Sequence, residues 1–404
     1  MRVFLFTHWY PPNSTAPAFR AQSWVEGFSK IAKEVIVITP YREGNEAYPA
    51  AYHNQILIEE RKGNIRIFRL PLSHHPLRSA IARMPNSAYR RFLMGLFYLL
   101  HHKPVHHSFD LDFEALESKL PLPQSNDWVL SSGPPFVLHR LALRWKMMHG
   151  CKWIADYRDL WTFGRDRFHW GWLREWWQER VDGEWERHWL HLADRLVTVG
   201  PTLAADLQNQ FPKVDVSVLE NGAQEDMKQL SPPKSGGNRW LYVGNLYPAQ
   251  KSIWRFFSLL DDAIRQDGLD FELRFLGSNH YGCLDELFAQ FPIVAQHCKS
   301  LTWQNRPEIL DHYNWSNGCV HFPYEGAEGI PSAKRNEYAC SGRKTITYSN
   351  QSKQEVLDWA KSTDFPEVPL HLFRQYLVDL WIGDHVRSDG NLSKGRPRSQ
   401  DNFI

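Results

Sequence analysis

Cysteine, long apolar runs and net charge are all scarce in this sequence, and each scarcity argues against a class of protein. Five cysteines occur among the 404 residues, none in a CxxC pair, which argues against a zinc site or a disulfide framework and favours a reducing compartment. The longest apolar block, FLMGLFYLL at 92–100, has less than half of the roughly 20 residues that a spanning helix needs. The apolar run at the start is too short for a signal sequence. We therefore expect a cytoplasmic protein.

Net charge and length set the broad class. A formal charge of +2 gives no electrostatic footprint for duplex nucleic acid, so we expect no nucleic-acid partner. Hydrophobic residues make up 43% and charged residues 23% of the chain, as in globular proteins. Because domains cluster near roughly 100 to 200 residues, a chain of 404 residues predicts two domains.

Tryptophan is abundant: 18 residues, seven of them between Trp161 and Trp189. One interpretation is that these rings pack a core. The other is that they form a surface for a glycan or lipid-linked acceptor, or for a membrane, because aromatic rings suit both settings. The sequence leaves both interpretations open.

The first half of the chain alternates buried strands with helices. RVFLFT is followed by a turn, a helix-spaced apolar pattern over 18–33 and the second strand EVIVIT, which together predict a βαβ unit of a parallel sheet. The alternation continues to residue 222, so we predict an N-terminal, acceptor-binding Rossmann-like domain over 1–222. An insert at about 73–126 breaks the pattern. It contains SAYRRFLMGLFYLLHH, which predicts either a helix packed on this domain or a peripheral contact with the inner face of a membrane.

A second alternation follows a polar stretch rich in glycine and proline. We predict a linker at 223–238, a C-terminal nucleotide-sugar-binding Rossmann-like domain at 239–365, and at 366–404 a helix that packs back on the N-terminal domain and ends in a loose tail. The predicted fold class is α/β, with two tandem doubly wound domains facing a central cleft. Ligands of such sheets bind at the carboxyl ends of the strands.

The segment GIPSAKRNEYACSG (329–342) has the composition of an anion site. Gly329 predicts a turn before a short helix, with Ser332 at its N-cap, and the helix start offers free N–H groups to a phosphate. Lys334 adds a full charge there. Glu337, one turn further along, can accept hydrogen bonds from two ribose hydroxyls. An anion site beside a diol acceptor favours a nucleotide, whereas the alternative is a solvated Glu337.

The segment LYVGNLYPAQKS (241–252) predicts a second such helix start. Gly244 ends the strand and Lys251 begins the next helix. Two helix starts and two lysines suit a diphosphate, whose charge they would stabilise without a metal ion. We therefore expect neither a metal nor another cofactor.

The motifs in their order resemble those of GT-B glycosyltransferases, and are most similar to glycosyltransferase family 4. The likeness rests on WYPPNSTAPAFRA, SSGPPFVLHRLALRWKMMHGCKWIADYRDLW, ADRLVTVG, VLENG, YVGNL and GIPSAKRNEYACSGRKTI. The resemblance implies transfer of a sugar, with retention of configuration, from a nucleotide-sugar to a glycan or lipid-linked acceptor, commonly in bacterial surface polysaccharide synthesis. The C-terminal domain would hold the donor.

The resemblance also implies residue roles. The donor-binding residues would be Gly244, Asn245, Lys251, Gly329, Ile330, Ser332, Lys334 and Glu337, with Glu337 on the ribose and Lys251 on the diphosphate. The catalytic candidates are Asp156, Arg158, Asp159 and Lys251. The acceptor-side candidates are Ser14, Thr15, Arg20 and Trp161. For the DYRDLW segment the alternative is a structural Asp–Arg pair at a strand end.

The sequence departs from the family pattern at several positions. Ser14, Thr15 and Ala16 stand where adjacent glycines are usual, and Asn245 stands where an arginine is typical. One phosphate cation is therefore missing or is replaced by Arg20 or Lys334.

Two alternative functions fit the same motifs, and two other motifs resemble metal sites. A UDP-sugar epimerase of the same fold, or a noncatalytic sugar-binding or assembly relative, would also fit the motifs. The DLD at 110–112 and the histidines of HHKPVHH (101–107) resemble metal ligands, but we interpret both as parts of the insert without a metal role, because neither follows a strand of the predicted nucleotide fold nor has ligand partners at suitable spacing.

Overall fold

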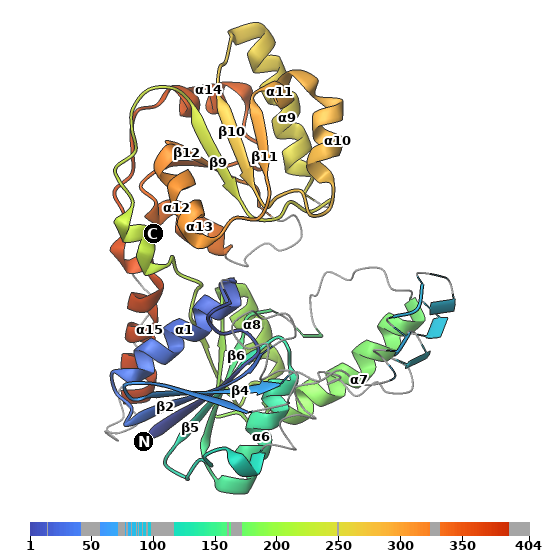
Figure 1. Cartoon of the computed structure of the whole chain (residues 1–404), viewed down its shortest axis with the longest axis vertical. Helices are drawn as coiled ribbons and strands as arrows, with labels where there is room; N and C mark the ends of the chain where they lie inside the picture. Colours follow the sequence, from blue (N-terminus) through green and yellow to red (C-terminus); the bar gives the residue numbers. More distant parts are fainter. Residues whose placement is uncertain are drawn as a thin grey trace.

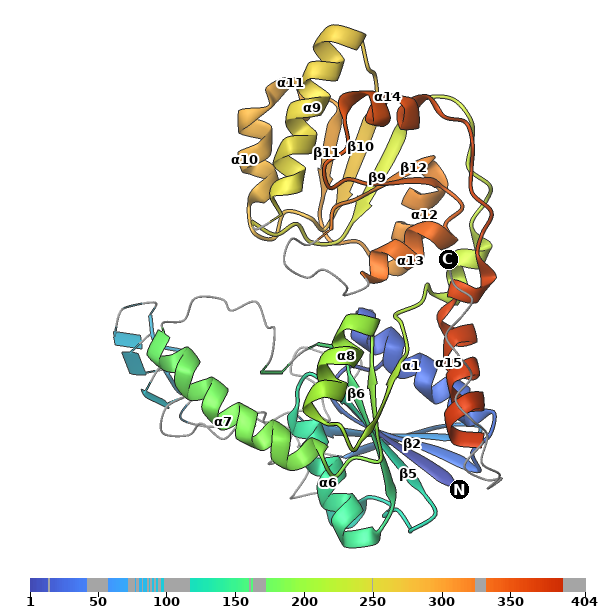
Figure 2. The same cartoon turned by 180° about the vertical axis from the view of Figure 1, so that it is seen from behind.

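The computed structural model describes residues 1–13, 15–41, 57–71, 117–159, 161–162, 172–248, 250–323 and 332–387, together with scattered residues between 77 and 97. Two sheets organise the chain, one in each half of the sequence, and helices flank them (Figures 1 and 2). The structure confirms the predicted α/β class with two doubly wound domains. No helix in the described ranges is both long and apolar enough to cross a bilayer.

The N-terminal sheet has eight strands in the order β3-β4-β2-β1-β5-β6-β7-β8. All neighbours are parallel except β3 and β4. The apolar runs make the central strands, since parallel strands covered on both faces need side chains that are buried throughout. The strands are β1 (Arg2–Thr7), β2 (Glu34–Tyr41), β3 (Ile58–Lys62), β4 (Ile65–Pro71), β5 (Trp128–Gly133), β6 (Lys152–Tyr157), β7 (Arg195–Thr198) and β8 (Asp215–Val218).

Helices cover both faces of this sheet. They are α1 (Ala16–Ser29), α6 (Val137–His149), α7 (Trp172–Leu190) and α8 (Pro201–Gln210), with a short 3-10 turn η1 (Glu117–Lys119). Both views show α7 extending away from the domain, with described pieces between 77 and 97 near its far end (Figures 1 and 2). At the near end of α7, Trp189 and Leu190 are buried in the core.

The C-terminal sheet has five parallel strands in the order β11-β10-β9-β12-β13. They are β9 (Arg239–Val243), β10 (Glu272–Leu276), β11 (Cys298–Leu301), β12 (Gly318–His321) and β13 (Lys344–Thr347). The helices of this half are α9 (Lys251–Asp267), α10 (Cys283–Gln290), α11 (Pro292–Gln296), α12 (Arg306–Trp315), α13 (Ala333–Cys340) and α14 (Lys353–Lys361). The carboxyl ends of these strands face the N-terminal domain (Figure 1).

The chain crosses between the domains twice, and the two crossings touch each other. The first contains η2 (Glu225–Gln229); the second contains η3 (Leu370–Leu372), α15 (Arg374–Ile382) and the π-helical turn η4 (Gly383–Arg387). Ala223 of the first crossing pairs with Phe373 of the second in an isolated parallel bridge. The α15 helix then packs against α1, where the rings of Trp24 and Trp381 meet edge to face with centroids 5.0 Å apart.

Candidate functional site

The loop after β9 begins at a glycine that no other residue could replace without strain. Gly244 has a φ of +103°, which side-chain-bearing residues rarely adopt. A methyl group on it would also lie 2.8 Å from Lys334 Cε. Its N–H donates to the carbonyl oxygen of Leu276 at 2.9 Å. The carboxyl end of β9 is therefore held against the end of β10, with the Lys334 side chain packed directly on it.

Lys334, in the first turn of α13, fastens this helix to the β9 loop. Its Nζ donates to the Tyr242 hydroxyl at 2.8 Å and to the Asn245 carbonyl oxygen at 3.3 Å, and lies 4.4 Å from the centre of the Tyr242 ring. Burial lowers the Lys334 pKa to about 7. The cause is that removing an ammonium from water favours its neutral form. The full charge expected at Lys334 stays a prediction.

Glu337, one turn further along α13, is an ion-paired residue and not a solvated one. Its side chain is 15% exposed, and its Oε1 accepts a hydrogen bond from Arg306 Nη1 at 3.0 Å. The same guanidinium binds both carboxylate oxygens of Asp226 in the first crossing, at 2.8 and 2.7 Å. Burial works to lower the Arg306 pKa, but the two carboxylates raise it overall. Arg306 was not singled out in the sequence.

A second chain of polar contacts runs from α13 into the N-terminal domain. Asn336 donates through Nδ2 to the Asn221 carbonyl oxygen at 2.9 Å. The side chain of Asn221 accepts from Arg20 Nη1 at 3.1 Å, and Arg20 forms a 2.6 Å ion pair with Asp156 at the end of β6. The predicted donor helix is thereby joined to the predicted catalytic segment through the first crossing.

The Arg20–Asp156 pair is enclosed by protein. Arg20 is 2% exposed and Asp156 is fully buried, and Asp156 also accepts from Ser132 at 2.8 Å. Burial works to raise the Asp156 pKa, but Arg20 and the Ser132 hydrogen bond hold it below its ordinary value. An Asp–Arg pair at this strand end was one interpretation of the sequence, and the structure shows that its arginine is Arg20, 136 residues away.

The other N-terminal candidates differ in exposure. Arg158 donates through Nε to the Gly133 carbonyl oxygen at 3.0 Å and is 9% exposed, whereas Asp159 is exposed. Trp161 is 4% exposed and stacks on Phe136, with ring centroids 4.9 Å apart. Thr15 occupies the N-cap position of α1 and donates through Oγ1 to Asn13 Oδ1 at 2.6 Å. Of these four, Asp159 presents its side chain most openly.

The N-terminus of α9 brings one predicted residue and one unpredicted residue to the same edge. Lys251 is the first helical residue and is exposed. Gln250 before it is buried, accepts from the Tyr247 N–H at 2.9 Å and donates to the Phe322 carbonyl oxygen at 3.1 Å. Gln250 therefore ties the β9 loop to the end of β12, a role that its sequence position did not signal.

One more residue of this edge, His321, was missed. His321, the last residue of β12, is 6% exposed, its Nδ1 has no hydrogen-bond partner among the described residues, and its pKa is lowered to about 4 by burial and then by Lys334 and Arg335. Ser332 is the N-cap residue of α13 as expected, but within the described part of the chain its side chain makes no capping hydrogen bond.

Similarity to known proteins was found only in three dimensions. No protein-family model matches the chain, and no curated protein sequence matches it. The structure aligns over 97% of the chain, and over the whole length of the other protein in both cases, with two solved structures. One is the sucrose-phosphate synthase of Thermosynechococcus elongatus, at 13% identity and a TM-score of 0.62. The other is the E. coli trehalose-6-phosphate structure bound with UDP-2-fluoro glucose, at 12% identity and a TM-score of 0.59.

The chain has the GT-B fold. A structure described as a UDP-N-acetylglucosamine 2-epimerase from Listeria monocytogenes also aligns, over 100% of this chain and 99% of the other, at 10% identity and a TM-score of 0.51. The alignment in three dimensions establishes the GT-B architecture. At identities this low, the assignment to a particular family, including glycosyltransferase family 4, stays a prediction.

Several predicted positions of the GT-B chain lie outside the described residues. They are Ser14, Gly329 and Ile330, the DLD at 110–112, the histidines at 101–107 and the tail from 388. Within the described residues, no group of three or more histidine, cysteine, aspartate or glutamate side chains is arranged to hold a metal ion.

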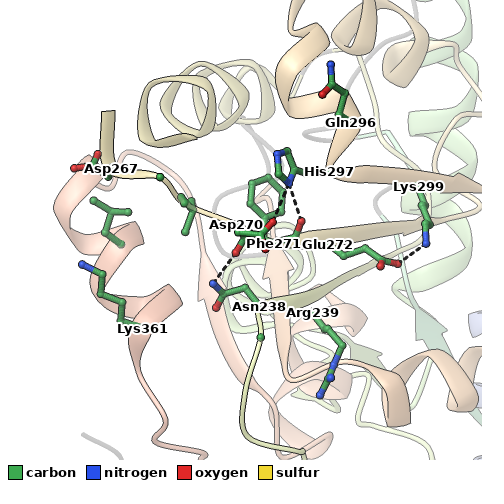
Figure 3. A pocket seen from close by; sticks show the side chains of 14 residues that line it. Asn238, Arg239, Asp267, Asp270, Phe271, Glu272, Gln296, His297, Lys299 and Lys361 are labelled. Atoms are coloured by element: carbon green, nitrogen blue, oxygen red, sulfur yellow. Dashed lines mark hydrogen bonds and ion pairs between the residues drawn. The ribbon is translucent and has the colours of Figure 1, made fainter. Parts of the chain in front are cut away.

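One open pocket of about 810 Å³ lies at the C-terminal GT-B sheet, on the edge opposite to the strand ends at Gly244 and His321 (Figure 3). It is lined at the amino ends of β9, β10 and β11. Glu272 is paired with Lys299 at 2.9 Å, and His297 with Asp270 at 3.4 Å. Because ligands of doubly wound sheets bind at the carboxyl ends, this pocket does not bear on the predicted donor site.

Proposed function

We propose that this protein is a retaining, metal-independent glycosyltransferase that moves a sugar from a nucleotide-sugar donor to a glycan or lipid-linked acceptor. The observation that carries the proposal is that Lys334 of α13 packs on the carboxyl end of β9, with Glu337 one turn further along the same helix, in a GT-B fold. A cation packed on a glycine turn and a held carboxylate next to it suit a diphosphate and a ribose.

The donor would be bound by residues from three segments. Glu337 would accept the ribose hydroxyls, since a carboxylate has about four acceptor positions and Arg306 uses one of them. Lys251 and Lys334 would bind the diphosphate, with the loop at Gly244 and Asn245. Ser332, Gly329 and Ile330 would complete the donor site from the segment before α13.

The reaction would proceed on one face of the sugar. The bond from the anomeric carbon to the diphosphate breaks while the bond to the acceptor oxygen forms on the same face, and the leaving diphosphate oxygen takes the proton of the acceptor hydroxyl. Lysine ammonium groups would stabilise the charge that grows on the diphosphate, where losing one such group costs roughly 3 kcal/mol of transition-state stabilisation. No protein nucleophile is required.

The acceptor would lie on the N-terminal domain. Asp159 is exposed after β6 and would contact it, whereas Arg158 and the buried pair of Asp156 and Arg20 would position that loop. Ser14, Thr15 and Trp161 would line the same side. We infer a role in bacterial surface polysaccharide synthesis from the family resemblance.

Contact with the inner face of a membrane would suit a lipid-linked acceptor. In the insert, Tyr89 is 62% and Phe92 is 64% exposed, and aromatic side chains with neighbouring arginines favour an anionic bilayer surface. Flotation with anionic vesicles in low and high salt tests this. Binding that salt abolishes would support it, and absence of binding in low salt would refute it.

The deciding experiment uses a panel of nucleotide-sugars. A donor should raise the melting temperature, and the same donor should be consumed faster when acceptor glycans are added. An epimerase, the function that the Listeria neighbour favours, would turn over its donor with no acceptor present. A noncatalytic relative would bind and convert nothing.

A further inference from the structure

Trp303, between β11 and α12, is the most exposed tryptophan among the described residues. It is 61% exposed. Burying a large ring is favourable, and Tyr and Trp rings left in the open at a polar edge commonly contact a ligand or partner. The described residues leave most of this ring uncovered, so it is available to a ligand.

The Trp303 ring packs on the backbone at Gly277. Gly277, directly after β10, has a φ of +63°, and a methyl group on it would lie 2.8 Å from Trp303 Cε3 and 3.6 Å from Trp303 Cα. The Gly277 N–H donates to the Leu301 carbonyl oxygen at 2.9 Å. The indole therefore lies over the end of β10, on the space that a side chain at residue 277 would fill.

The backbone that carries Trp303 is held from its other side. Asn305 caps α12 through a capping box: its Oδ1 accepts from the Glu308 N–H at 3.1 Å, and its own N–H donates to Glu308 Oε2 at 2.8 Å. A loop fixed at both ends presents the ring with little entropy left to lose on binding.

The position of the ring matches the dimensions of a nucleotide. Trp303 stands on the end of β10 next to β11, and Gly244 ends β9, so one to two strand spacings of about 4.8 Å separate them, roughly 5 to 10 Å. Three residues of chain, spanning at most roughly 11 Å, join Trp303 to Arg306, which binds Glu337. The ring is thus within a nucleoside's length of the carboxylate that would hold the ribose.

We propose that Trp303 is the stacking platform for the base of a nucleoside diphosphate donor. This proposal rests on the proposed function, because it takes Glu337 as the ribose site and Lys334 as the diphosphate site. Stacking on one indole face accepts any base, so Trp303 would set affinity, while selection among bases would come from polar groups around it.

The test measures binding of UDP, ADP, GDP and inorganic pyrophosphate to the full-length chain by calorimetry. For the nucleotide that binds the wild-type protein, Trp303→Ala should weaken affinity by about fivefold or more, and Trp303→Phe should restore most of it. Pyrophosphate affinity should not change, since it has no base. Trp185→Ala, which removes another exposed indole, is the matched control and should leave all affinities unchanged.

The outcomes separate the two proposals. If Glu337→Ala weakens nucleotide binding but Trp303→Ala does not, the stacking role is overturned and the donor site stands. Equal weakening of nucleotide and pyrophosphate by Trp303→Ala would show a structural effect and also overturn the stacking role. If no nucleotide binds the wild-type chain, both proposals fall. Melting temperatures confirm that each variant is folded.

Discussion

Asn336 and Asn221 join the two domains through one hydrogen bond, from the Asn336 side-chain amide to the Asn221 carbonyl oxygen at 2.9 Å. Asn336 precedes Glu337 in α13, and Asn221 accepts from Arg20, the partner of Asp156. The helix turn that carries Glu337, the proposed ribose acceptor, is therefore connected by a short run of polar contacts to the β6 strand end at Asp156, 181 residues away in sequence (337 − 156).

Removing Arg20 should strongly destabilise the N-terminal domain. Arg20→Ala leaves Asp156 buried with its charge unpaired, and loss of one partner of a buried pair costs about 3 to 5 kcal/mol. Urea unfolding followed by circular dichroism measures this. Arg187→Ala, which breaks an exposed pair with Glu184 on α7, should change the free energy of unfolding by less than about 1 kcal/mol. Similar losses in both variants would contradict the assignment.

Acid should weaken the same pair. Because the Asp156 pKa is held below its ordinary value, the pair contributes stability at pH values above that ordinary value and loses it as the pH falls through the lowered one. Asp156→Asn should unfold with a shallower dependence on pH in the acid range than the wild-type chain. An identical acid profile for the two proteins would show that another group governs acid unfolding.

Donor binding should take up a proton at Lys334. The Lys334 pKa of about 7 lies below the ordinary 10.5, so between these values the folded chain binds fewer protons than the unfolded one and its stability rises with pH. A diphosphate favours the ammonium form. Affinity for the bound nucleotide should therefore fall as the pH rises above about 7, and calorimetry in buffers of different ionisation enthalpy should detect proton uptake.

Lys334→Met tests whether Lys334 is the group that takes up the proton. It should bind the nucleotide more weakly and without proton uptake near neutral pH. Uptake that persists in the variant would assign the proton to another group, such as His321.

Two residues should lower turnover without unfolding the protein. Lys251→Ala removes an exposed cation at the start of α9, and Glu337→Ala removes the proposed ribose acceptor; each should reduce sugar transfer at least about tenfold. Arg265→Ala, near the end of the same helix and paired with Asp261, is the matched cation control. Wild-type rates in the two site variants would remove the site assignment.

Arg306 should act through Glu337. A lysine at 306 cannot bind Asp226 at two points and Glu337 at a third, because an ammonium lacks the planar fork of a guanidinium. Arg306→Lys should therefore raise the dissociation constant of the nucleotide, while the double variant with Glu337→Ala should be no weaker than Glu337→Ala alone. Additive losses in this cycle would mean that the two residues act independently.

The local hydrophobic pattern of the sequence predicted the secondary structure well in the segments where that pattern is strong. RVFLFT and EVIVIT form β1 and β2, and the helix-spaced pattern over 18–33 forms α1 (Ala16–Ser29). Short apolar runs next to turn residues favour strands, and apolar residues every three to four positions favour a helix. The polar stretch at 223–238 was expected only as a linker. It contains η2 and pairs with Phe373 through Ala223, an interaction between distant segments that no local pattern encodes.

The sequence by itself determined the order of strands and helices, the two-sheet class and the presence of a lysine and a glutamate one turn apart, since all of these depend on neighbours within a few residues. Only the tertiary structure decided which charges meet. Arg306 pairs with Glu337 across 31 residues and Arg20 with Asp156 across 136, because partners for buried charges are chosen by the packing of distant elements, and composition carries no record of that distance. The same packing left Trp303 exposed and lowered the pKa of Lys334.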